Sequence, residues 1–207
     1  DAASVKKGDT LAAPGSMVLT DPADVHLALL ADSPFSVRHG AQLRLHHGAA
    51  ALTCRCVFFD RAELLPGETC FAQLRLAAPM AARMGDRFAV PSLSPAPPLG
   101  GGVLLDLSPR HKKKDPGLAE RLSALASPDP LRRMAAALEL HAFPQTLEAL
   151  AMAAGLSPAE GQAALDALAR TEKAVPLGEF WLSASAMEAL ARRAAELLDG
   201  WHAARPL

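Results

Sequence analysis

The sequence is poor in the residues that would place it in a specialised class of protein. It has no tyrosine, only 4 % aromatic residues and three cysteines. Its 21 Lys and Arg nearly balance its 22 Asp and Glu, which excludes a polycationic tail that selects partners by bulk charge. Charged residues interrupt its apolar runs well before the roughly 18–20 residues that a membrane-spanning helix needs. We therefore expect an ordinary globular chain with no membrane partner.

The cysteines indicate a reducing compartment. The number of cysteines is odd, and no C-x-x-C pair occurs among Cys54, Cys56 and Cys70. In a strand, Cys54 and Cys56 would lie on the same face. No further ligand follows at a spacing typical of zinc, so the sequence predicts core thiols and no metal site. No signal peptide is recognisable, and the chain begins at Asp1 rather than at Met. We expect a cytoplasmic, soluble piece of a longer polypeptide.

The composition changes in the middle of the chain. Residues 1–108 contain short β-like runs between Pro, Gly and Asp, whereas residues 116–207 are rich in Ala, Leu and Glu with helical periodicity. A basic segment bounded by prolines, residues 108–116, lies between them and is typical of a domain edge. The pattern predicts two modules, at 18–108 and 129–207, joined by a basic linker and a short helix over 109–128.

The first module is predicted to be all β. Six runs have the alternation or apolar content of strands, with turn residues between them at roughly ten-residue spacing. They are residues 25–30, 42–46, 51–59, 69–76, 87–90 and 103–107. Residues 65–68 are a turn, and Gly100, Gly101 and Gly102 are expected just before the last strand. This order predicts an antiparallel β-barrel or sandwich.

The second module has clear helix boundaries. Asp129 followed by Pro130 opens one helix, and Ser157 with Glu160 forms a capping box that opens another. Residues 175–182 are predicted to form a β-hairpin, and Ser185 with Glu188 is predicted to be a second capping box. Three helices, a hairpin and a further helix are the order of a winged helix-turn-helix.

Several strings in the first module resemble translational elongation factors. They are Glu63-Leu64-Leu65-Pro66-Gly67-Glu68-Thr69-Cys70, then Pro79-Met80-Ala81-Ala82-Arg83-Met84-Gly85-Asp86-Arg87-Phe88, and Gly100-Gly101-Gly102-Val103-Leu104. Residues 7–15 resemble the end of a preceding barrel domain. We therefore assign residues 1–17 to that domain. The glycine triplet running into a basic segment, followed by a winged helix, is similar to the bacterial selenocysteine-specific elongation factors.

That resemblance implies a fold and a function. The first module would be the six-stranded antiparallel barrel that forms the third domain of these factors. The parent protein would deliver selenocysteinyl-tRNA to the ribosome at recoded stop codons, and later winged helices would bind a hairpin of the selenoprotein mRNA. This chain would supply contact with the tRNA T-stem and a spacer towards those winged helices, as a monomer.

The resemblance also identifies what this chain lacks. The family is a GTPase whose nucleotide and Mg²⁺ bind an N-terminal domain, but no G-x-x-x-x-G-K-[ST] or D-x-x-G motif occurs here. No G-x-S-x-G motif or paired carboxylates indicate another catalytic centre. We therefore expect this piece to be no enzyme and to hold no cofactor.

The candidate RNA-binding residues are basic or lie in turns. His46, His47 and Gly48 end a strand that, by the resemblance, faces the T-stem, and Arg83 lies in a turn. Arg110, Lys112, Lys113 and Lys114 belong to the only dense basic run. Each has an alternative interpretation: a strand-end histidine pair without a partner, a solvated turn residue and a solvated linker.

The predicted recognition helix, residues 157–173, is acidic. Residues 130–207 carry 7 Lys and Arg against 9 Asp and Glu. Because phosphate neutralisation supplies much of the affinity for nucleic acid, this module is better suited to a spacer or protein-contact role. A winged-helix DNA-binding regulator and a plain protein-docking module remain as alternative functions.

Overall fold

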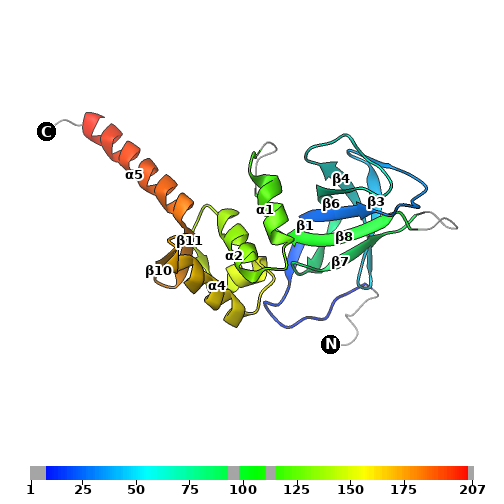
Figure 1. Cartoon of the computed structure of the whole chain (residues 1–207), viewed down its shortest axis with the longest axis horizontal. Helices are drawn as coiled ribbons and strands as arrows, with labels where there is room; N and C mark the ends of the chain where they lie inside the picture. Colours follow the sequence, from blue (N-terminus) through cyan, green and yellow to red (C-terminus); the bar gives the residue numbers. More distant parts are fainter. Residues whose placement is uncertain (1–7, 93–97, 111–114, 205–207) are drawn as a thin grey trace. The chain divides into compact units, whose positions relative to one another are not determined.

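The computed structural model describes residues 8–92, 98–110 and 115–204, with side chains described up to residue 201. By its internal contacts the chain divides into two compact units, Asp1–Ala126 and Ser127–Leu207. Each unit is described by itself (Figure 1). The domain boundaries expected from the sequence stay predictions.

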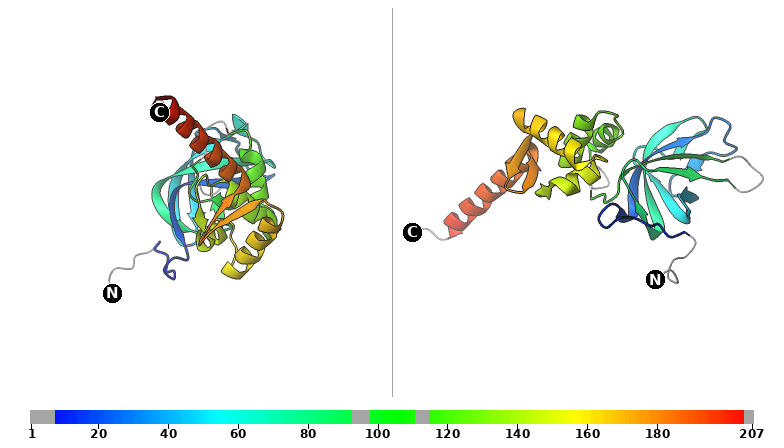
Figure 2. Two further views of the ribbon diagram at one scale, coloured as in Figure 1. Left: turned by 90° about the vertical axis from the view of Figure 1, so that its left-hand side faces the viewer. Right: turned by 90° about the horizontal axis from the view of Figure 1, so that it is seen from below.

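The first unit is a closed antiparallel barrel, as the sequence and the resemblance predict. Its strand order is β1-β6-β4-β3-β7-β8 (Figures 1 and 2). The six strands are β1 (Val18–Leu29), β3 (Gln42–His47), β4 (Ala50–Phe58), β6 (Thr69–Ala82), β7 (Arg87–Val90) and β8 (Gly100–Asp106). Closure leaves no unpaired sheet edge, which removes a common site of strand-to-strand aggregation.

Alternate side chains of these strands fill the barrel. Val25, Leu27, Leu45 and Leu74 are completely buried in one continuous cluster. The three cysteines belong to the same cluster, with reduced thiols. Burial raises the pKa of Cys54 and Cys70 to about 11 and that of Cys56 to about 12. The thiols therefore stay protonated at neutral pH, and they react only when the barrel opens.

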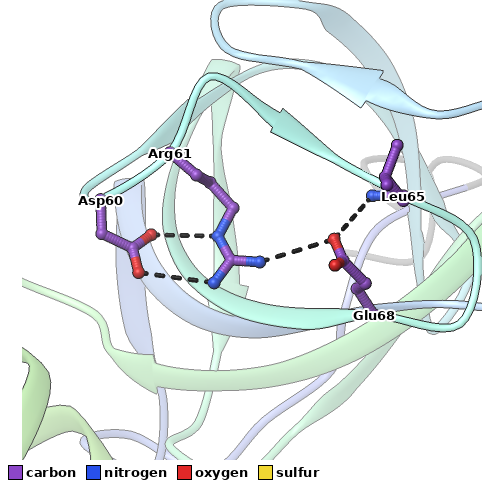
Figure 3. A network of polar contacts seen from close by, with 4 residues as sticks. All are labelled: Asp60, Arg61, Leu65 and Glu68. Carbon is purple, nitrogen blue, oxygen red and sulfur yellow. Dashed lines mark hydrogen bonds and ion pairs between the residues drawn. The ribbon is translucent and has the colours of Figure 1, made fainter.

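A small two-stranded sheet and an ionic cluster accompany the barrel in the first unit. β2 (Val37–Arg38) pairs with β5 (Glu63–Leu64). Beside it, the Arg61 guanidinium donates to the Asp60 carboxylate at 3.1 and 3.4 Å and lies 3.6 Å from Glu68 (Figure 3). Glu68 in turn accepts a hydrogen bond of 2.9 Å from the Leu65 backbone (Figure 3). These contacts hold the predicted turn at residues 65–68, which has Gly67 at φ +82°.

The glycine triplet lies inside β8, and not before it as the sequence suggested. Gly101 and Gly102 pair with residues of both β1 and β7. A Cβ at Gly102 would overlap the carbonyl oxygen of His26 and lie 2.7 Å from the ring of Phe88. The glycines are needed because neighbouring backbone approaches β8 too closely for any side chain.

A short helix completes the first unit. α1 (Leu118–Leu125) contacts β1 and β8 (Figure 1). It buries Leu118, Leu122 and Leu125, which lie on one helical face. The sequence predicted a short helix within residues 109–128, and the structure has it at Leu118–Leu125.

The second unit has the predicted winged-helix order. Its elements are α2 (Pro130–Glu139), β9 (Gln145–Thr146), α3 (Leu147–Ala153), α4 (Pro158–Arg170), β10 (Ala174–Leu177), β11 (Phe180–Ser183) and α5 (Ala184–Ala204). The three helices α2, α3 and α4 pack on one another, and β11 lies between β10 and β9. Met134, Leu150, Leu165 and Leu182 form the buried centre.

Two predicted helix caps are confirmed and one is not. Asp129 caps α2, with Pro130 as the first helical residue. Ser157 and Glu160 make both hydrogen bonds of a capping box at the start of α4. The Ser185–Glu188 box is wrong, because Ser183 Oγ accepts from the Ala186 backbone while Ser185 Oγ donates to Glu139 at 2.8 Å. β11 runs directly into α5, so the last strand residue supplies the cap.

Candidate nucleic-acid interface

The histidine pair splits into one exposed and one engaged side chain. His46 is exposed on the outer surface of β3. His47 Nε2 lies 3.0 Å from Asp86 Oδ2, and its side chain is only 10 % exposed. Gly48, at φ +54°, makes the turn into β4. Of the three predicted residues, His46 alone presents its ring to solvent.

Arg83 ties separate segments of the barrel together. Its Nε donates to the Ser16 carbonyl at 2.7 Å, and its backbone N–H donates to Asp86 Oδ2 at 2.8 Å. Asp86 therefore joins the β6–β7 turn to His47 on β3. This geometry favours a structural role for Arg83, and its contact with RNA stays a prediction.

One residue of the basic run, Arg110, belongs to the described part of the chain. Arg110 is exposed just after β8. Lys112, Lys113 and Lys114 lie outside the described residues, so their part in RNA binding stays a prediction. No metal-binding group of three or more His, Cys, Asp or Glu exists among the residues that the structure describes. Within the same residues, no helix is long and apolar enough to cross a membrane.

The structure adds a set of basic residues that the sequence analysis missed. Arg44 on β3, Arg55 on β4 and Arg75 on β6 are all exposed on the outside of three neighbouring strands. We call these three residues the arginine face. β3, β4 and β6 contain no aspartate or glutamate, which is the signal that could have identified it.

Strand register places two of these arginines directly opposite each other. Arg55 pairs with Arg75 across β4 and β6, and Gln42 pairs with Arg55 across β3 and β4. Arg44 lies one outward row further, opposite Thr53. Like charges opposite each other destabilise a sheet, so the Arg55–Arg75 pair does not stabilise the barrel.

The arginine face is held out towards solvent. No ion pair joins Arg44, Arg55 or Arg75 to a carboxylate in the described part of the chain. Arg75 Nε donates to the neutral Gln73 side chain at 3.0 Å. The Gln73 amide in turn donates to the Asp24 carboxylate at 3.2 Å. The Arg55 guanidinium lies against Gly40, where a Cβ would be 3.2 Å from Nη2. Guanidinium groups exposed on neighbouring strands suit a row of phosphates.

The recognition helix of the second unit has the opposite character. Glu160, Asp166 and Arg170 are the exposed charged residues of α4, and two of the three are acidic. Hydrogen bonds from the Ser157 side chain and backbone hold the pKa of Glu160 below its usual value. Glu160 is therefore ionised at neutral pH, and α4 lacks the basic surface that usually binds a phosphate backbone.

Comparisons with known proteins agree on one family. The family model described as the beta-barrel domain of selenocysteine-specific elongation factor matches residues 23–111. The selenocysteine-specific elongation factor of Desulfomicrobium baculatum is 31 % identical over 127 residues, which are 61 % of this chain and 20 % of that protein.

The fold also matches a solved structure. The crystal structure of bacterial selenocysteine-specific elongation factor EF-Sec gives a TM-score of 0.69 over 97 % of this chain and 30 % of that chain, at 18 % identity. The likeness shows the fold, and this chain spans less than a third of the length of either relative. Residues 23–111 thus match the β-barrel domain of the selenocysteine-specific elongation factors, and the curated relative is a protein of the same name.

Proposed function

We propose that this chain is the part of a selenocysteine-specific elongation factor that contacts selenocysteinyl-tRNA through its barrel. The whole protein would deliver that tRNA to the ribosome at recoded stop codons. This chain has no phosphate-binding loop motif in its sequence. The GTP and Mg²⁺ of the whole protein would therefore bind a domain outside this chain. This chain would therefore bind RNA and not catalyse a reaction.

The arginine face is the observation that supports tRNA contact most directly. Arg44, Arg55 and Arg75 form an exposed cationic surface without acidic neighbours on β3, β4 or β6. His46 lies on the same outer side of β3, two residues beyond Arg44. Contacts from arginine to phosphates position an RNA helix without reading its sequence, as contact with a tRNA stem requires.

The winged-helix unit would act as a spacer or a protein contact. Its acidic recognition helix does not suit an RNA backbone. By linking the barrel to the mRNA-binding end of the whole protein, it would raise the effective concentration of one binding module at the site of the other.

Filter binding of an elongator-type tRNA at several salt concentrations tests this division of roles. Replacing Lys112, Lys113 and Lys114 by Ala is expected to weaken binding uniformly across RNA sequences. The slope of log affinity against log salt should flatten by about one for each phosphate that the chain no longer neutralises.

The matched variant carries Arg170→Ala and Lys173→Ala on the winged-helix unit and is expected to bind almost as the wild type does. If that variant loses affinity and the lysine variant does not, the recognition helix contacts RNA and the spacer role is wrong.

A further inference from the structure

Helix α1 is packed as a part of the barrel unit. Leu122 is 0 % exposed and Leu125 is 1 % exposed, although the helix has only eight residues. A helix of eight residues is unstable by itself in water. Packing against the rest of the unit must therefore stabilise α1. Its contacts within this unit are with β1 and β8.

The barrel offers α1 a matching apolar surface. Leu105, where the register of β1 and β8 shifts, is only 1 % exposed. It does not belong to the interior cluster that contains its neighbour Leu104. Leu105 is therefore buried from outside the barrel, on a strand that α1 contacts.

The beginning of α1 is fixed by one carboxylate. Asp115 accepts a hydrogen bond of 3.1 Å from the Gly117 backbone and forms an ion pair with Arg121. The Leu118 backbone N–H also donates to the Asp115 carbonyl. These contacts hold the chain in place from Asp115 into the first turn of α1.

The second unit begins almost immediately afterwards. The Asp129 side chain accepts from the Leu131 backbone at 2.9 Å and caps α2, and Pro130 is the first helical residue. Only Ser127 and Pro128 separate Ala126 from this cap.

We propose that α1 is a strap belonging to the barrel, and that the joint between the two units consists of Ser127 and Pro128 alone. The basic segment is then not the connection between the two units. Pro128 also fixes the backbone φ angle of one of these two residues.

The assignment shortens the stretch of chain that connects the two units. The assignment itself does not rest on the proposed function, but its consequence for RNA binding does. A flexible linker of twenty residues would have a root-mean-square span of about 25 Å, whereas two residues span at most about 7 Å. Shortening the tether raises the effective concentration of each unit near the other.

The chain contains separate reporters for its two units. All three cysteines lie in the barrel, and both tryptophans, Trp181 and Trp201, lie in the winged-helix unit. In urea titrations of the full chain, thiol labelling reports opening of the barrel and tryptophan fluorescence reports the second unit.

Leu122→Ala is expected to lower the urea midpoint of thiol exposure by about 1 M or more and to leave the tryptophan transition unchanged. Leu165→Ala, at a buried position of α4, should do the reverse. Ser123→Ala, on the exposed face of α1, should move neither transition. A Leu122→Ala shift in the tryptophan transition, in both transitions or in neither would overturn the strap.

Hydrogen exchange of the wild-type chain provides a test that needs no variant to fold. Amides at the end of α1 should exchange with the opening free energy of the barrel strands β1 and β8. Exchange at the rate of α2, or exchange as fast as an unprotected peptide, would refute the proposal. Neither result depends on tRNA binding, so the strap and the proposed function can fail separately.

Discussion

Replacing Arg44, Arg55 and Arg75 together by Gln is expected to reduce tRNA affinity about 10–100-fold at 0.1 M salt, because the neutral side chains no longer pair with three phosphates. The slope of log affinity against log salt should fall by about three. The barrel should stay folded, because the Arg55–Arg75 pair is a repulsion that the substitution removes. Filter binding at four or more salt concentrations measures both quantities.

The matched control removes the same number of positive charges from the other unit. Arg132, Arg192 and Arg193 are also exposed, but they lie in the winged-helix unit. Their triple replacement by Gln changes the net charge equally and should leave the affinity within about threefold and the salt slope nearly unchanged. Equal losses of affinity in the two variants would mean that bulk charge, and not the arginine face, holds the RNA.

Gly102→Ala is expected to destabilise the barrel by about 3 kcal/mol or more, since overpacking against fixed backbone cannot be relieved by a rotamer change. The new methyl group would overlap the His26 carbonyl oxygen on β1 and crowd Phe88 on β7. Urea titration followed by thiol labelling should show the destabilisation, with the tryptophan transition of the other unit unchanged.

Gly85→Ala separates steric overlap from backbone strain. Gly85 has φ +89°, and a Cβ there would meet nothing within 4 Å. Its substitution should cost only about 1–2 kcal/mol, the free energy of placing a residue with a side chain in a left-handed conformation. A Gly102→Ala variant as stable as the wild type would show that β8 can move away from its neighbours.

The barrel could be predicted from the sequence because its apolar residues recur with period two. The length of β1 could not be predicted. Residues 21–24 of this strand contain Asp21, Pro22 and Asp24, which indicate a loop locally. Pairing with β6 extends the strand through a register shift between Thr20 and Pro22, and a proline is tolerated at such an irregularity.

The site was harder to predict because its partners are distant in the sequence. His47 contacts Asp86, 39 residues away, and the Arg83 side chain contacts Ser16, 67 residues away. Arg55 and Arg75 become neighbours only through the register of β4 and β6. Such contacts cannot be predicted from residue spacing, because they depend on which strands pair and in which register. The Ser157–Glu160 cap could be predicted, because it depends on spacing alone.

Hydroxyl-radical footprinting of a tRNA bound to this chain tests the central claim most directly. The account predicts protection of the T-stem backbone, retained with the Arg132, Arg192 and Arg193 variant and abolished with the Arg44, Arg55 and Arg75 variant. Protection of another part of the tRNA at saturating protein, or a T-stem footprint that survives removal of the arginine face, would contradict it.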